Sequence, residues 1–211
     1  NLARTLYELA TRRAELAGEA EVERTYAEVA TRLRALIGAR AVRVARDDQR
    51  QTLTLEVLDE GGAYIPARSL SDGTLRFLVL CVMSIDPGVQ GLLCMEEPEN
   101  GIHPERIAAM AELVHGLAVD PQRTPGQDNP MRQVIVNTHS PLFMARMRDE
   151  DLLFSQIASV RRAEHPARAL RLRPIAGTWR TAGDARGGVS RTTIQHYLTL
   201  PVGGQASIEG A

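Results

Sequence analysis

The stretch from residue 91 to residue 104 constrains this chain more than any other. It reads Gly-Leu-Leu-Cys-Met-Glu-Glu-Pro-Glu-Asn-Gly-Ile-His-Pro. A short apolar run ends in two adjacent carboxylates, Glu96 and Glu97; the proline that follows stops the strand, and Asn-Gly is a turn signal. Pro104 can begin a helix, because its missing N–H is not needed in the first turn. The stretch therefore predicts a strand, an acidic tip, a tight turn and a helix.

The position of the acidic tip predicts a chemistry. In an open parallel sheet, ligands bind outside the carboxyl ends of the strands. Adjacent carboxylates at that place can hold a hydrated magnesium ion and can orient a water molecule for attack on a phosphate. We therefore expect an α/β fold with Glu96 and Glu97 at its ligand-binding edge.

A second segment, residues 69–74, reads Ser-Leu-Ser-Asp-Gly-Thr and is predicted to open a helix that runs to about Ile85. Ser71 or Asp72 can cap this helix, and Gly73 lets the backbone approach a ligand closely. Free N–H groups at a helix N-terminus bind phosphate. The segment is therefore a second candidate for a phosphate contact.

A third segment follows the acidic tip. Residues 133–138 are predicted to form an apolar strand, and His139 and Ser140 come directly after it. A histidine at the carboxyl end of a parallel strand is well placed to contact a ligand.

In chain order, the segments at residues 69–74, 91–104 and 133–140 resemble the signature loop, the Walker B strand with its D-loop, and the strand with the switch histidine of ABC-type ATPases. The resemblance is to the branch that includes RecF, SMC and the AbiEii-like bacterial defence ATPases. It implies ATP and Mg²⁺ as cofactors: Glu96 would hold the metal, Glu97 would orient the attacking water, and His139 would sense the γ-phosphate with help from Ser140. Glu96 departs from the aspartate that most relatives have, which adds one methylene to the metal ligand.

The resemblance also implies a homodimer with ATP sandwiched between two subunits. Ser71, Asp72 and Gly73 of one subunit would touch the nucleotide of the other, and Asn100 and Gly101 of the D-loop would link the two sites. Asp72 replaces the first glycine of the commonest signature, as it does in the AbiEii-like branch.

The sequence contains no lysine and no G-x-x-x-x-G-K-[ST] segment, so the lysine that binds the β- and γ-phosphates is missing. We therefore expect the chain to be the C-terminal half of an ATPase that is inactive alone. An N-terminal P-loop half, on the same polypeptide or a separate segment, would complete it. A lysine-free chain rich in alanine and arginine also suggests a GC-rich bacterial source.

The expected fold is P-loop NTPase-like, with a mostly parallel sheet and helices on both faces. Residues 1–38 are predicted to form a helical hairpin, residues 39–201 the ABC-type half with its four motifs, and residues 202–211 a flexible tail. Further predicted elements are a β-hairpin (41–46 and 52–58), a helix (104–118), a surface loop (119–130), two strands (152–157 and 168–175) and a last helix (192–198).

Composition narrows the class of protein. The net charge of −1 over 211 residues supplies no global basic field for nucleic acid. The longest apolar run, residues 77–83, is too short to cross a bilayer. Cys81 and Cys94 lie in apolar runs and are expected to be buried free thiols, which suits the cytoplasm.

The function expected from the resemblance is ATP hydrolysis coupled to nucleotide-driven dimerisation, in DNA repair or in a phage-defence or toxin system. DNA, or a nuclease or toxin, is a candidate further partner, and a membrane is not. Two alternatives remain open: a metal-dependent nuclease that uses Glu96, Glu97 and Glu99, and a catalytically silent scaffold regulated by nucleotide. The acidic run at residues 149–151 is interpreted as the solvated start of an edge strand, and His103 as a helix-start residue rather than a metal ligand.

Overall fold

The computed structural model describes residues 1–162, 165–182 and 187–199, and the predicted tail at residues 202–211 lies outside this range. The chain divides into two compact units, Asn1–Thr138 and His139–Ala211, which are considered separately below. Residue 38, the predicted end of a helical lobe, lies inside the first unit. The helix that precedes it packs against elements on both sides of that point.

The first unit begins with the predicted pair of helices, α1 (Leu2–Ala17) and α2 (Ala20–Ile37). Asn1 caps α1 through its side chain, and Gly38 ends α2 in the left-handed conformation at φ 65°. Gly38 can do so because glycine carries no Cβ. Apolar residues at helical spacing make the buried faces of the two helices: Leu6, Leu9, Val29 and Leu33.

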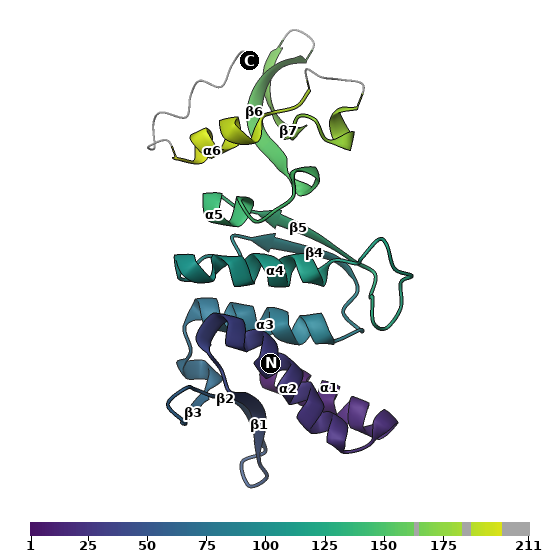
Figure 1. Ribbon diagram of the computed structural model, residues 1–211, viewed down its shortest axis with the longest axis vertical. Helices are drawn as coiled ribbons and strands as arrows, with labels where there is room; N and C mark the ends of the chain where they lie inside the picture. Colours follow the sequence, from purple (N-terminus) through teal and green to yellow (C-terminus); the bar gives the residue numbers. More distant parts are fainter. Residues whose placement is uncertain (163–164, 183–186, 200–211) are drawn as a thin grey trace. The chain divides into compact units, whose positions relative to one another are not determined.

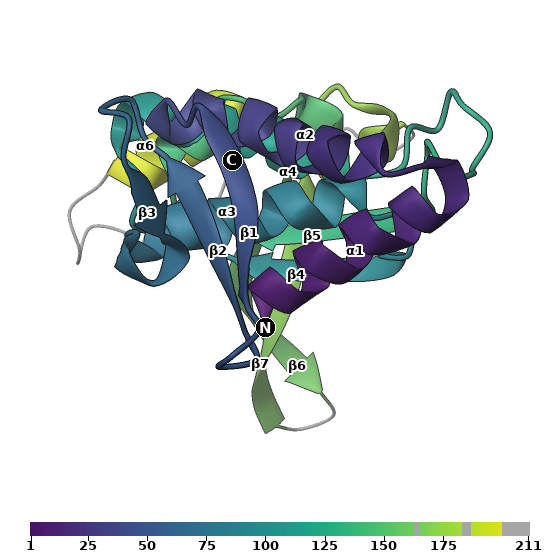
Figure 2. The same cartoon turned by 90° about the horizontal axis from the view of Figure 1, so that it is seen from below.

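A small antiparallel sheet follows, in the order β1-β2-β3. Its strands are β1 (Ala41–Asp47), β2 (Thr52–Leu58) and β3 (Tyr64–Pro66). The Asp47 carboxylate accepts hydrogen bonds from the N–H groups of Gln49 and Arg50 and so shapes the turn of the predicted hairpin. Figure 2 shows β1 and β2 beside α1 and α2, against which they pack.

The rest of the first unit is layered (Figure 1). The parallel strands come first, then α4, then α3, then the helical hairpin. The elements are η1 (Ala67–Ser69), α3 (Asp72–Ile85), β4 (Gly91–Glu96), η2 (Pro104–Arg106), α4 (Ile107–Leu117) and β5 (Arg132–Asn137). The helix α3 is apolar over most of its surface because it lies between two other layers, and Phe77, Leu78 and Cys81 are almost fully buried.

The strands β4 and β5 pair in parallel, from Gly91 opposite Arg132 to Glu96 opposite Asn137. The α/β class is thereby confirmed, and this pair is the parallel sheet within the described residues. One face of the pair is open, since Leu92 is 56% exposed and Ile135 is 58% exposed.

Cys94 lies on the same open face. The prediction that both thiols are buried is therefore wrong for Cys94 and right for Cys81. An apolar run does not reveal which face of its strand is covered, because side chains alternate between the two faces.

The second unit contains η3 (Asp149–Asp151), η4 (Trp179–Thr181), and an antiparallel pair, β6 (Leu153–Arg162) with β7 (His165–Pro174). Two helices accompany this pair, α5 (Pro141–Met144) and α6 (Arg191–Thr199). Its small core consists of Met144, Phe154, Ile175, Val189 and Ile194. Within the parts of the chain that are described, no helix is both long and apolar enough to cross a membrane.

Candidate functional site

The N-terminal end of α3 is capped by Ser71, one of the two residues predicted for that role. Its Oγ accepts a hydrogen bond from the N–H of Thr74 at 3.2 Å, and the two hydroxyl oxygens lie 2.9 Å apart. Ser71 and Asp72 are exposed, whereas Gly73 and Thr74 are buried. The predicted signature segment therefore presents two polar side chains and the start of a long helix to its surroundings.

Gly73 and Gly101 bring the signature segment and the predicted D-loop into contact within one chain. A Cβ added to Gly73 would lie 2.4 Å from the carbonyl oxygen of Gly101, which no side chain could occupy. Gly101 has φ +79°, a conformation that favours glycine. Both positions thus require glycine, and the two predicted motifs are in direct contact.

The acidic tip carries an unusual backbone. Glu96 ends β4 and is exposed, while the next residue, Glu97, is partly buried and has φ 44°. The N–H of Glu97 donates to the carbonyl of Asn137 at 2.8 Å, and its carbonyl accepts from the N–H of Asn100 at 3.0 Å. The left-handed region is uncommon for residues other than glycine, so this turn is held by its surroundings.

Arg76 is one of the residues that hold this turn, and the sequence analysis did not assign it a role. Its Nη1 donates to the carbonyl of Glu97 at 2.9 Å and lies 3.4 Å from the carbonyl of Asn100. A signal was present in the sequence, because Arg76 is the one charged residue between Gly73 and Ile85.

Glu99 differs from the two carboxylates before it. It is 8% exposed, its Oε1 accepts a hydrogen bond from the Thr138 hydroxyl, and its Oε2 has no partner among the described residues. Glu99 is thus buried while Glu96 is exposed. Across the described ranges, no three His, Cys, Asp or Glu side chains are grouped so that they could hold a metal ion. The nuclease centre built from the three glutamates stays an open alternative.

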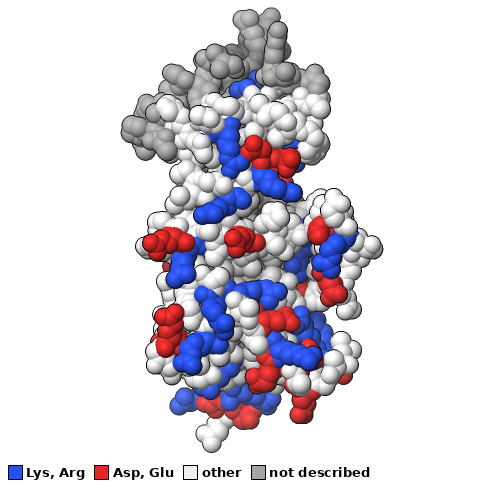
Figure 3. Space-filling model, in the orientation of Figure 1, with Lys and Arg blue, Asp and Glu red and all other residues white. Residues whose placement is uncertain are grey.

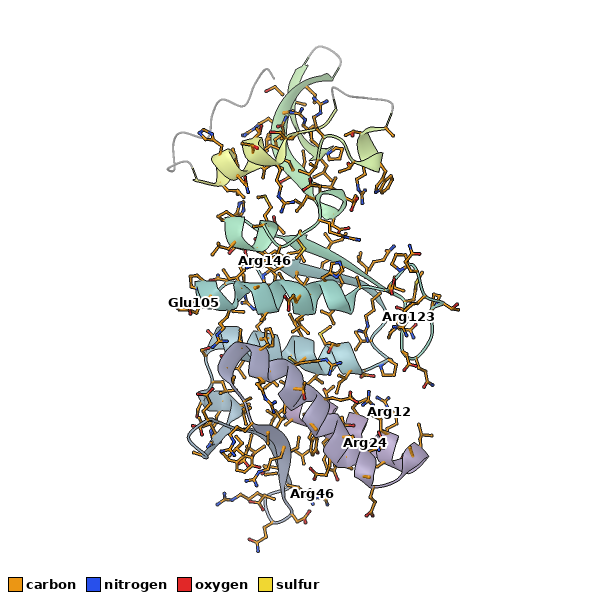
Figure 4. The ribbon with its side chains drawn as sticks, viewed as in Figure 1. Arg12, Arg24, Arg46, Glu105, Arg123 and Arg146 are labelled. Carbon is orange, nitrogen blue, oxygen red and sulfur yellow. The ribbon has the colours of Figure 1, made fainter. Side chains whose placement is uncertain are left out.

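The opposite end of α3 is held by arginines from other elements. Arg132, 2% exposed, donates from Nε to the Val89 carbonyl and from Nη2 to the Asp86 carbonyl, each at 2.6 Å. Burial lowers the pKa of the Arg132 guanidinium. Arg13 donates to the Ile85 carbonyl, and Arg12, labelled in Figure 4, lies 3.5 Å from an Asp86 carboxylate oxygen. These contacts supply cations to a helix end that has no basic residue in its own last turn.

His139 and Ser140 are the first residues of the second unit, whereas the carboxylates belong to the first. His139 is exposed and directly follows Thr138, the residue that contacts Glu99. The Ser140 hydroxyl caps α5 by accepting from the N–H of Phe143 at 3.2 Å. Ser140 thus has a structural role in the second unit, in addition to any contact with a ligand.

Other acidic and histidine residues have local roles. His103 accepts a hydrogen bond from the N–H of Glu105 through Nδ1 at 3.4 Å, which confirms its interpretation as a helix-start residue. In the second unit, Asp149 pairs with Arg191, and Asp151 pairs with Arg148 at 2.8 Å. Basic and acidic side chains are interspersed over the side of the first unit seen in Figure 3. That side carries no broad single-sign patch of the kind that binds nucleic acid.

Comparison with known proteins identifies the family. Residues 8–145, more than half of the chain, match the family described as AAA domain, putative AbiEii toxin, Type IV TA system. No curated protein matches the chain.

Several solved structures are similar in fold. One comes from a study of ATP-driven dimerisation and DNA-stimulated activation of SMC ATPases; it is 13% identical, has a TM-score of 0.41, and the match covers 70% of this chain and 86% of that one. Another is the Smc head domain with a coiled coil and joint from Pyrococcus yayanosii. It is 12% identical and has a TM-score of 0.44, and the match covers 78% of this chain and 30% of that one. A third is the Smc head domain with an extended coiled coil bound to the C-terminal domain of ScpA from Pyrococcus furiosus. It is 13% identical and has a TM-score of 0.38, and the match covers 82% of this chain and 50% of that one. The chain thus spans half or less of the length of the last two.

Proposed function

Because the chain belongs to the family of AAA domains described as putative AbiEii toxins, we propose that it binds and hydrolyses ATP at the tip of β4. The observation that carries this proposal is the contact of three predicted motifs within one unit. The signature end of α3 touches the D-loop through Gly73 and Gly101, and the D-loop turn begins at the held backbone of Glu97.

Glu97 and His139 have different roles in this proposal. Glu97 is the base that orients a water molecule toward the γ-phosphate. His139 is the residue that senses the γ-phosphate. Oriented groups of this kind supply most of the catalysis in phosphoryl transfer.

The metal-binding role belongs to Glu96. Its carboxylate is exposed at the end of a strand and has no hydrogen bond or ion pair among the described residues. One free carboxylate is a donor set that suits Mg²⁺, which keeps several of its water ligands in proteins. When bound, the metal neutralises charge on the phosphates.

A P-loop half completes the site, either on the same polypeptide or as a separate segment. The open face of β4 and β5 supports this partner, since it exposes Leu92, Cys94 and Ile135. Parallel sheets are covered on both faces in nearly all proteins, and α4 covers one face here. The P-loop half occupies the other face and brings the lysine that the chain lacks.

The active form is a homodimer with ATP between two subunits. Ser71 and Asp72 are exposed at the capped end of α3, where they can meet the phosphates held by another copy. ATP-driven closure of the dimer then serves DNA repair or a defence system of the toxin type, with DNA or a nuclease or toxin as the further partner in the bacterial cytoplasm.

Substitution of Glu97 by glutamine tests the proposal. In protein joined to a P-loop segment, Glu97→Gln is expected to keep ATP binding and to lower kcat by about a hundredfold or more, because an amide cannot accept the proton of water. The closed dimer should accumulate, and size-exclusion chromatography with ATP should detect it. Glu112→Gln, an exposed glutamate on α4, is the matched control and should hydrolyse ATP as the parent does.

Two results would contradict this assignment. Hydrolysis by Glu97→Gln at the parent rate would move the catalytic role to another carboxylate, with Glu96 tested next. A parent protein that binds ATP but never hydrolyses it would instead be the silent scaffold.

A further inference from the structure

Arg76 reaches from α3 to the backbone of the acidic tip. Its guanidinium donates to the Glu97 carbonyl at 2.9 Å and lies 3.4 Å from the Asn100 carbonyl. These two carbonyls stand at the ends of one turn, which the N–H of Asn100 closes by donating to the carbonyl of Glu97. Both contacts come from Nη1, which carries two N–H donors, so one nitrogen of the guanidinium can hold both ends of the turn.

The turn needs this support because Glu97 has φ 44°. Two of its backbone contacts come from residues close to the sheet: the Asn137 carbonyl, which accepts from its N–H, and the N–H of Asn100. Arg76 supplies the contact from the helix layer. The direction of the Glu97 side chain follows from its backbone angles, so whatever holds the backbone also aims the carboxylate.

The helix α3 touches the same turn at a second point. Gly73, one helical turn before Arg76, packs against the carbonyl of Gly101 so closely that a Cβ would lie 2.4 Å from that oxygen. The helix is also rigidly embedded, with Phe77 and Leu78 buried and Arg132 bonded to carbonyls beyond its far end. A displacement of its capped end must therefore move the turn that contains Glu97.

We propose that Arg76 is a positioning residue that couples the signature end of α3 to the carboxylate of Glu97 in the same chain. This inference rests on the proposed function, in which the signature end meets the nucleotide of the partner subunit while Glu97 acts on the chain's own nucleotide. Arg76 then makes hydrolysis at one site depend on the occupancy of the other. Its guanidinium is engaged with backbone carbonyls, so it acts through Glu97 rather than on the phosphate.

The kinetic test uses protein that contains the P-loop segment. Arg76→Met should lower kcat about tenfold or more and leave KM for ATP within about twofold, because a misaimed base slows chemistry without removing a phosphate contact. Arg76→Lys should recover part of the loss, since an ammonium can reach one of the two carbonyls. Arg68→Met is the matched control, because Arg68 is exposed on η1 and has no hydrogen bond or ion pair with any described residue.

A second measurement, amide hydrogen exchange, does not depend on ATPase activity. In the 211-residue chain, hydrogen exchange at residues 97–102 should become about fivefold faster in Arg76→Met and stay unchanged in Arg68→Met. Exchange within β1 and β2 should stay the same in both variants and so shows that the fold is intact.

The outcomes separate the two proposals. A parent protein without ATPase activity overturns the proposed function, whatever the exchange data show. An active parent whose Arg76→Met variant keeps the parent kcat overturns the coupling role alone. A fall in kcat without any change in exchange at residues 97–102 also overturns it, because Arg76 would then act by another route.

Discussion

Glu97 combines a catalytic assignment with a backbone conformation that favours glycine. At φ 44°, a residue with a Cβ costs about 1 kcal/mol or more relative to glycine. The Glu97 carboxylate at the tip therefore lowers the free energy of unfolding. Such a cost is common where function needs a particular side chain.

Two substitutions that both remove the carboxylate measure this cost. Glu97→Gly is expected to be more stable than Glu97→Ala by about 1 kcal/mol, because glycine adopts the left-handed region freely. Urea denaturation of the two variants gives the difference in the free energy of unfolding. At an ordinary position the order is reversed, since glycine gains more conformational freedom in the unfolded chain. An alanine variant at least as stable as the glycine variant would therefore show that the backbone of Glu97 is unstrained.

At the scale of the element, α3 makes functionally different contacts at its two ends. Its first turn is capped by Ser71 and touches the D-loop, and its last turn is held by Arg13 and Arg132. The buried middle transmits any movement between these ends, because close-packed interiors deform little.

Ser71→Arg should abolish hydrolysis and spare ATP binding to the variant's own P-loop. A bulky side chain would fill the space that the partner's γ-phosphate needs. Loss of the cap should also cost about 1 kcal/mol of stability. Ser71→Thr keeps a hydroxyl cap and is the control for stability, which urea denaturation measures beside the ATPase rate.

Mixing separates the two defects. A dimer of Ser71→Arg with Glu97→Gln has one site with both defects and one site with neither, so partial activity should return if the sites work independently. Unchanged turnover and unchanged ATP-driven dimerisation in Ser71→Arg alone would reduce residues 71–73 to an ordinary helix cap.

At the scale of the whole molecule, the open face of β4 and β5 is the surface to which the proposed P-loop half would bind. Leu92 and Ile135 are each more than half exposed on a parallel strand pair, which is unusual for this kind of sheet. Burying such apolar side chains favours association, and the gain must exceed the translational and rotational freedom that two polypeptides lose on binding.

Cys94 reports directly on that face. With a thiol reagent near neutral pH, Cys94 should react in the 211-residue chain and be protected once the P-loop half is joined or added. Cys81 is the internal control and should not react in either form, because burial raises its pKa to about 12 and keeps it protonated. Mass spectrometry identifies the labelled residue. Equal labelling of Cys94 with and without the P-loop half would place that half elsewhere.

Much of the fold could be predicted from local signals. The capped helix after Ser71, the strand that ends at Glu96 and the hairpin of β1 and β2 each follow from side-chain periodicity and turn residues that lie close together in the chain. The order of the motifs also indicated the family, which the match to residues 8–145 confirms. The roles of Glu96, Glu97 and His139 stay predictions.

The sequence by itself determined which elements form and where the polar chemistry lies along the chain. Only the tertiary structure decided that Cys94 faces outward, that Gly73 meets Gly101, and that Arg76 holds the backbone of Glu97. The physical reason is the range of the interactions. Helix caps and strand endings depend on neighbours within a few residues, whereas Arg76 and Glu97 are 21 residues apart and meet because α3 packs against the layer that carries the acidic tip.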